Sequence, residues 1–153
     1  MENFSKTTLT MSVLMTPNMA NFRGNVHGGE ILKMLDHVAY ALGARYSGRN
    51  VVTLSVDRVL FKSPISIGTL VTFLASVNYT GKTSMEIGIK VISEDIHKHT
   101  VTHTNSSFFT MVAIDEDGKP TPVEPFIPQT PDEKRRYENA KKRREHSLSL
   151  NPK

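Results

Sequence analysis

The chain has one long, strongly apolar helical segment, followed by four segments that alternate like strands. Apolar residues recur at helical spacing over residues 29–46, and they also occupy the other faces of that helix. A helix that is apolar all round is expected to be buried, and Ser47-Gly48 supplies its stop. Strands are predicted at residues 8–15, 51–61, 69–80, 83–94 and 101–114, with hairpin connections between the later ones.

Only this helix is available to cover the predicted sheet. The simplest arrangement is therefore an α+β fold in which a curved antiparallel sheet wraps around one long central helix. One helix would leave part of such a sheet bare, so pairing with a second copy of the chain is expected.

The 153 residues are expected to form one domain, and the absence of cysteine excludes disulfides and thiolate chemistry. No apolar run approaches the roughly 20 residues that a membrane span needs, and no signal-peptide pattern precedes the first strand. No membrane association is therefore expected.

Charge is unevenly distributed along the chain. Residues 1–129 contain 11 basic and 11 acidic residues, whereas residues 130–153 contain eight and four, which accounts for the net charge of +4. We therefore divide the chain into a body, residues 1–129, and a basic C-terminal helix and tail, residues 130–153. Thr130-Pro131-Asp132-Glu133 has the pattern of an N-cap with a capping box. The basic helix either meets phosphate groups or presents a solvated face, and the sequence leaves both open.

The loop before the central helix is the strongest candidate for chemistry. Gly28-Gly29 leaves backbone N–H groups bare at a helix N-terminus, where negative charge is favoured. Asp36 is a carboxylate among apolar residues of the same helix, about 10 Å along the axis from Gly29. One reacting carbon cannot touch both groups within one chain. Two antiparallel helices in a dimer would bring Asp36 of one beside Gly29 of the other, although a structural ion pair of Asp36 with His37 or Arg45 is the alternative.

Other residues of the loop are ambiguous by type alone. Asn21 and Asn25 flank a turn that either of them could close, and His27 is the type of residue that supports such a turn. The remaining histidines lack metal-ligand spacing, so no metal is proposed. No serine nucleophile elbow and no dinucleotide or phosphate-loop fingerprint is present.

Three runs of the sequence identify the family that the chain resembles: ANFRGNVHGGEILKMLD, VTLSVDRVLFKSPISIGTLV and VNYTGKTSMEIGIKV. Together they resemble the hotdog-fold acyl-CoA thioesterases of the cytosolic acyl-CoA hydrolase type, and the likeness spans roughly residues 8–145. The resemblance implies the hydrolysis of fatty acyl-CoA to free fatty acid and CoA in the cytoplasm. It also implies active sites shared across a homodimer, commonly assembled as a trimer of dimers (a homohexamer), with no cofactor other than the CoA of substrate and product.

The same resemblance assigns roles to individual residues. The family's catalytic Asn matches Asn21 rather than Asn25, and its catalytic Asp matches Asp36. Thr53 matches a strand Thr near the reacting centre. The turn of Lys82, Thr83 and Ser84 matches one that lies along CoA. This chain carries both catalytic residues in a single repeat, so a homodimer would have two complete sites.

The chemistry expected from these assignments is acyl transfer to water. The Gly29 N–H would stabilise the oxyanion, while Asp36 acts as general base or nucleophile and Asn21 orients water or substrate. Asn25, His27 and Gly28 are assigned as substrate-binding residues of the same loop.

Two other functions are weighed against this one. They are an acyl-thioester hydratase or dehydratase, in which an acid would be wanted at Asn21, and a non-enzymatic acyl-CoA-sensing or nucleic-acid-binding module. No nucleic-acid partner is expected, because no motif for reading DNA is visible.

Overall fold

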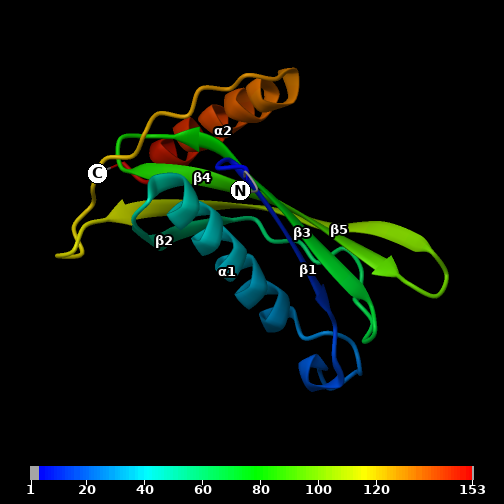
Figure 1. Ribbon diagram of the computed structural model, residues 1–153. Coiled ribbons are helices and arrows are strands. Elements are labelled where there is room, and N and C mark those ends of the chain that lie inside the picture. Colours follow the sequence, from blue (N-terminus) through cyan, green and yellow to red (C-terminus); the bar gives the residue numbers. More distant parts are fainter. Residues whose placement is uncertain (1–3, 153) are drawn as a thin grey trace.

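The computed structural model describes residues 4–152 and contains one five-stranded antiparallel sheet with two helices (Figure 1). The strand order in the sheet is β1-β3-β4-β5-β2. The elements along the chain are β1 (Thr8–Leu14), a short 3-10 helix (Pro17–Met19), α1 (Gly28–Ser47), β2 (Asn50–Asp57), β3 (Leu70–Thr80), β4 (Ser84–Asp95), β5 (Thr100–Ile114) and α2 (Pro131–Leu150).

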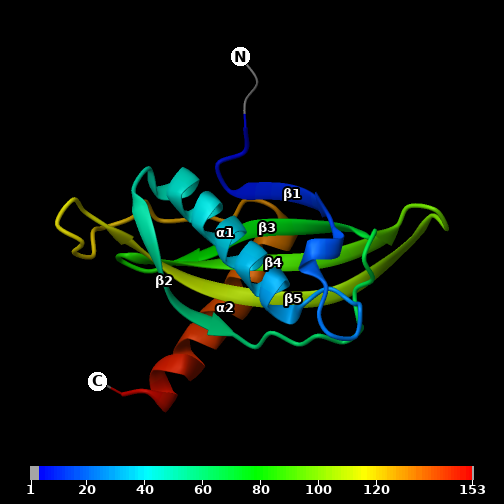
Figure 2. The same cartoon turned by 90° about the horizontal axis from the view of Figure 1, so that it is seen from below.

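The two helices lie on opposite faces of the sheet. Figure 2, which views the molecule from below, shows α1 running diagonally across one face with α2 behind the strands. The core lies between α1 and the sheet. Its most deeply buried side chains include Leu35 and Leu42 of the helix and Phe73, Ile87 and Phe109 of the strands. The predicted curved sheet wrapped around one central helix is confirmed.

Helix α1 begins and ends where its sequence signals predict. His27 is the N-cap, and Gly48 ends the helix in a left-handed conformation with φ +64°. In the single chain α1 is buried on one side only, contrary to the expectation of a fully buried helix, because the residues facing away from the sheet are exposed. They include Leu32, which is 39% exposed, and Tyr40, which is 45% exposed, with Asp36 between them on the same face.

The strand predictions are correct to within a residue or two except at β2. That strand ends at Asp57 rather than continuing to residue 61, because Arg58 takes a positive φ of 47° that breaks the extended backbone. Strand β2 is an edge of the sheet, and its register against β5 shifts between Thr53 and Ser55. This bulge lies beside the candidate site described below.

Helix α2 begins with the predicted capping box, in which Thr130 and Glu133 satisfy each other's backbone N–H groups. The helix packs against the sheet face opposite α1. Ala140 is buried, and Arg143 makes two hydrogen bonds of 2.7 and 3.1 Å to the Glu86 carboxylate. The Arg143–Glu86 ion pair therefore attaches the basic helix to the sheet, and only the outer face of α2 is solvated. Within residues 4–152, no helix combines the length and apolar character needed to cross a membrane.

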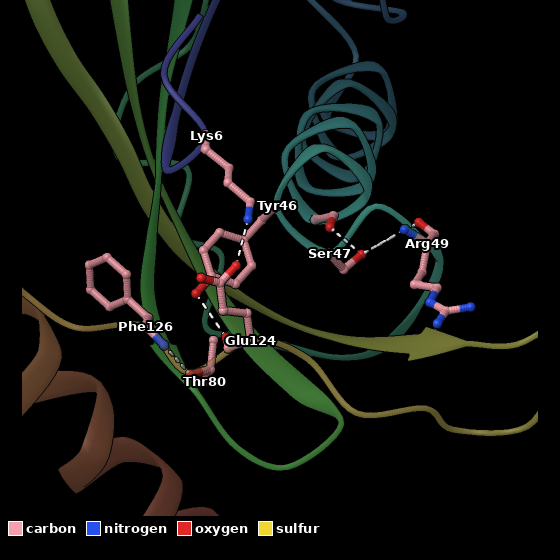
Figure 3. A network of polar contacts seen from close by, with 8 residues as sticks. Lys6, Tyr46, Ser47, Arg49, Thr80, Glu124 and Phe126 are labelled. Carbon is pink, nitrogen blue, oxygen red and sulfur yellow. Dashed lines mark hydrogen bonds and ion pairs between the residues drawn. The ribbon is translucent and has the colours of Figure 1, made fainter.

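The proline-containing segment between β5 and α2 is attached to the end of α1 (Figure 3). The Tyr46 hydroxyl donates a 2.9 Å hydrogen bond to the Glu124 carbonyl, and the Glu124 carboxylate pairs with Lys6 at 2.6 Å. Burial, reinforced by the Glu124 carboxylate, raises the pKa of Tyr46 from 10.0 to about 12. The Tyr46 proton is therefore held more tightly in the folded chain than in the unfolded chain.

This difference predicts a specific alkaline instability. Below pH 10 the stability contributed by neutral Tyr46 is fully present, and it is lost as pH rises from 10 towards 12, where the unfolded chain ionises first. We expect Tyr46→Phe to destabilise the protein at neutral pH by about 1 kcal/mol through the lost hydrogen bond. The difference in unfolding free energy between the wild type and this variant should then shrink above pH 10.

Denaturant unfolding at pH 7, 10 and 11.5 measures this difference. Tyr40→Phe is the matched control, because Tyr40 is on the same helix but is 45% exposed in the single chain. A constant difference between wild type and Tyr46→Phe across this pH range would contradict the prediction.

Candidate functional site

The candidate site is centred on a hydrogen bond between α1 and β2. The Thr53 hydroxyl lies 2.6 Å from Oδ1 of Asp36 and donates to it. Both residues are exposed, so the carboxylate is open on one side and held on the other. The sequence predicts apolar surroundings for Asp36, but in the single chain its carboxylate faces outward beside a hydroxyl donor. Asp36 therefore has an oriented carboxylate with a second oxygen free to act on a small molecule.

Strand β2 positions Thr53 through its pairing with β5. Thr53 is opposite Met111, and its hydroxyl also lies 3.5 Å from the Met111 sulfur. The residue after Thr53 is Leu54, the extra residue of the bulge, whose side chain is 68% exposed. Bulges redirect side chains and occur often beside active sites. Here the bulge shifts the register immediately after the residue that contacts Asp36, and regular pairing resumes at Ser55.

The first turn of α1 presents backbone N–H groups at the other end of the candidate site. The Gly29 N–H donates a 2.9 Å hydrogen bond to Nδ1 of His27, and the Glu30 N–H donates to the His27 carbonyl. No hydrogen bond among residues 4–152 involves the Gly28 N–H. The turn-supporting role expected of His27 is confirmed. In this structure Gly28 offers the uncommitted donor, and Gly29 could serve an oxyanion only by sharing or exchanging its bond to His27.

Side chains pack against both glycines of this turn, and the contact is tight at position 29. A side chain there would begin 3.1 Å from Nδ1 of His27, tighter than ordinary contact, so the capping imidazole would have to shift to admit one. A side chain at Gly28 would begin 3.6 Å from the Phe61 ring, which lies beyond the end of β2. No pattern in the sequence indicates that Phe61 approaches this turn.

Asn21 closes the loop that leads into α1. Its Oδ1 accepts hydrogen bonds from the backbone N–H groups of Arg23 at 2.9 Å and Asn25 at 3.1 Å. This is the turn-closing role expected from residue type. It has a chemical consequence, because two N–H donors identify that atom as oxygen and leave the amide nitrogen as the other terminal atom. Asn21 can therefore brace its loop and still donate an N–H to a ligand.

The turn of Lys82, Thr83 and Ser84 lies between β3 and β4. Its backbone is fixed, since the Lys82 carbonyl accepts from Val123 and the Ser84 hydroxyl accepts from Arg144 of α2 at 2.9 Å. Residue Met85, next to this turn, stands in the same cross-strand row as Met111 and Thr53. Two strand spacings make this separation about 10 Å.

The structure therefore brings some predicted residues together and leaves others apart. Asp36 and Thr53 touch, and the loop residues from Asn21 to Gly29 form one cluster around the start of α1. Asp36 lies seven residues after Gly29, so about 10 Å along the helix separates the two groups. No single small ligand atom can contact both groups in one chain.

Exposed apolar side chains occur on the same elements as the Asp36–Thr53 pair and on the segment after β2. They lie on the edge strand β2, on the segment after it and on the outer face of α1: Leu32, Tyr40, Val52, Leu54, Val56, Leu60 and Phe61. Phe22, beside Asn21, is also fully exposed. Several large exposed apolar side chains on and beside an open strand edge are typical of an interaction surface.

Comparison with known families gives the class of protein. Residues 23–99, which include α1 and its preceding glycines, match the model of the Thioesterase superfamily. The chain is 57% identical to protein VdlD of Helicobacter pylori over 140 residues, covering 92% of this chain and 80% of that protein. It is 36% identical over 132 residues to the cytosolic acyl coenzyme A thioester hydrolase of Rattus norvegicus, covering 85% of this chain and 35% of that protein. The chain belongs to the thioesterase superfamily.

Solved structures agree with this assignment. A hexameric acyl-CoA thioesterase, solved in its apo form, is 37% identical with a TM-score of 0.89, covering 95% of this chain and 94% of that one. An acyl-CoA hydrolase from Staphylococcus aureus, solved with butyryl coenzyme A and coenzyme A, is 29% identical with a TM-score of 0.86 and covers 94% of this chain and 87% of that one. Further structures of the staphylococcal hydrolase carry alanine in place of one aspartate, one asparagine or one threonine. The predicted hotdog fold is confirmed by these neighbours.

Proposed function

We propose that this protein hydrolyses acyl-CoA thioesters to a free carboxylic acid and CoA, with Asp36 as the general base. The observation that carries the proposal is the 2.6 Å hydrogen bond from Thr53 to Asp36. It holds one carboxylate oxygen in place and leaves the other to take a proton from water. Family membership and the acyl-CoA hydrolases among the relatives supply the substrate class.

The spacing of the residues supports the same assignment. In the staphylococcal hydrolase, the asparagine and aspartate that were replaced are 15 positions apart, and the aspartate and threonine are 17 apart. Asn21, Asp36 and Thr53 have these residue types at the same intervals. This agreement favours Asn21 over Asn25 as the catalytic asparagine.

The oxyanion of the tetrahedral intermediate would be held at the start of α1. The Gly28 N–H is uncommitted and the Gly29 N–H is shared with His27, so the two together can provide donors where negative charge develops. The amide nitrogen of Asn21 would donate to the thioester oxygen or orient the water. The thiolate of CoA is a good leaving group, so no strong acid is required.

A complete site needs two chains, because about 10 Å separates Asp36 from the Gly29 turn within one chain. We propose a two-fold dimer in which the β2 edges and the outer faces of α1 meet, so that Asp36 of one chain lies beside Gly28, Gly29 and Asn21 of the other. The exposed apolar side chains around β2 and α1 would be buried by this pairing. The hexameric thioesterase among the structural neighbours supports a trimer of such dimers. Lys82, Thr83 and Ser84 would then lie along the CoA.

Release of free thiol tests the proposed reaction. We expect purified protein to liberate CoA from butyryl-CoA or palmitoyl-CoA, detected with a thiol reagent, at a rate proportional to enzyme concentration. Hydration or sensing of an acyl-CoA would leave the thioester intact and release no thiol. Intact thioester across acyl chains from four to 16 carbons would overturn the proposal, and the relative rates would give the chain-length preference.

A further inference from the structure

A basic groove lies on the face of the sheet that carries α2, away from Asp36. It has a volume of about 640 Å³ and is bounded by strands β1, β3, β4 and β5 and by one side of α2. This volume is within the range of about 300–1,000 Å³ that is typical of small-molecule sites. Because α1 and β2 form the proposed dimer surface, that pairing leaves the groove open.

The lining of the groove has one sign of charge. Lys90, Arg135, Arg136 and Arg143 contribute to it, and none of the residues that line it is an aspartate or glutamate. A concave surface lined by one sign of charge focuses the electrostatic field and attracts small ions of opposite sign. The groove therefore favours an anion.

Two of these cations have no partner in the described part of the chain. Arg143 is bound to Glu86 and Arg135 to Asp132, so their charges are already compensated. The side chains of Lys90 and Arg136 make no hydrogen bond or close ion pair within residues 4–152, and Nε of Arg136 is buried without a partner. The Arg136 charge also acts on the Glu133 carboxylate, but the two groups form no direct ion pair. Burying a guanidinium N–H without a hydrogen-bond acceptor costs free energy. The Nε–H of Arg136 is therefore suited to donate to an acceptor on a bound ligand.

The polar walls of the groove are held in place. Asn78 is 2% exposed, donates to Glu86 at 3.1 Å and accepts from the Ser76 hydroxyl at 2.7 Å. Its amide lies against Gly88, where a side chain could not be accommodated. Leu74 and Phe108 add apolar surface to the lining. A ligand that fits must therefore carry both a strong acceptor and a less polar part.

We propose that this groove is a binding site for a small organic phosphate. Lys90 and Arg136 would supply charged donors to the phosphate oxygens, and Leu74 and Phe108 would contact the organic part. The phosphate belongs either to a free metabolite or to the nucleotide end of a CoA whose acyl group is bound by a neighbouring chain. A site for a free metabolite does not depend on the hydrolytic function, because the groove lies on the opposite face of the sheet from Asp36, whereas a site for the nucleotide end of CoA rests on the proposed function.

Calorimetric titration of the full chain with inorganic pyrophosphate tests the site. We expect wild type to bind with an affinity that weakens as salt is added, and Lys90→Gln and Arg136→Gln each to bind at least about tenfold more weakly. The matched control is Lys141→Gln, since Lys141 is exposed on α2 and does not line the groove. Equal affinity in all four proteins, or no binding by wild type, would overturn the proposal.

A second titration distinguishes the two sources of phosphate and separates this proposal from the hydrolytic one. The inactive Asp36→Asn protein is saturated with CoA and then titrated with pyrophosphate. Loss of pyrophosphate binding assigns the groove to the nucleotide end of CoA, and unchanged binding assigns it to a separate organic phosphate. Either assignment holds only if Lys90→Gln and Arg136→Gln weaken the binding of pyrophosphate. Binding is read without turnover, so a protein that failed to hydrolyse acyl-CoA would still test the groove.

Discussion

Replacing Asp36 by Asn should reduce kcat for acyl-CoA hydrolysis by about two orders of magnitude or more, the loss typical of a removed acid–base group. The amide oxygen of Asn can still accept the hydrogen bond from Thr53 that the carboxylate accepts at 2.6 Å. The amide oxygen is, however, too weakly basic to take a proton from water. The change therefore removes the proton acceptor and leaves the local geometry in place.

Steady-state kinetics should show the loss in kcat, with KM changed much less. Thr53→Val is the companion variant. It removes the donor that orients the carboxylate while keeping the carboxylate itself, and we expect a smaller loss of about tenfold. Thermal unfolding and the mass in solution should match the wild type for both proteins, since Asp36 and Thr53 are exposed in the single chain. An Asp36→Asn enzyme with turnover near that of the wild type would remove Asp36 from the mechanism.

The fold could be predicted from local signals because those signals agree with the tertiary structure. Neighbouring residues alone define these elements. The apolar period marks α1, the left-handed Gly48 ends it, and the capping box at Thr130 begins α2. The end of β2 could not be predicted. Residues 58–61 keep a strand-like composition, and only the positive φ of Arg58 shows that the chain turns towards α1.

The site was harder to predict, and the reason is that its contacts are made between distant segments. Residue type correctly identified Asn21 as a turn-closing residue, whereas the proposed catalytic role came from resemblance to a family. These two roles are compatible because they use different atoms of one amide. The hydrogen bond from Gly29 to His27 depends on the rotamer of a side chain, which no sequence pattern specifies. Exposure of Asp36 likewise followed from the direction in which α1 faces the sheet.

Mixing two inactive variants should restore activity if each active site is built from two chains. Asn21→Ala and Asp36→Ala homodimers each lack one group in both of their sites and should be nearly inactive. After subunit exchange at equal concentrations, half of the dimers are mixed. Each mixed dimer has one site with Asn21 and Asp36 both intact, and one with neither. The pool should therefore recover about a quarter of wild-type activity, as two-fold symmetry requires.

The matched control mixes wild type with the double variant Asn21→Ala/Asp36→Ala. Here every mixed dimer has one defect in each of its two sites, so exchange should halve the activity of the mixture. Exchange is verified by native mass spectrometry with one partner isotopically labelled. If both groups of a site came from one chain, the first mixture would stay inactive and the second would lose nothing. If the sites are shared, subunit exchange raises the activity of the first mixture and lowers the activity of the second. A general effect of dissociation would change both activities in the same direction.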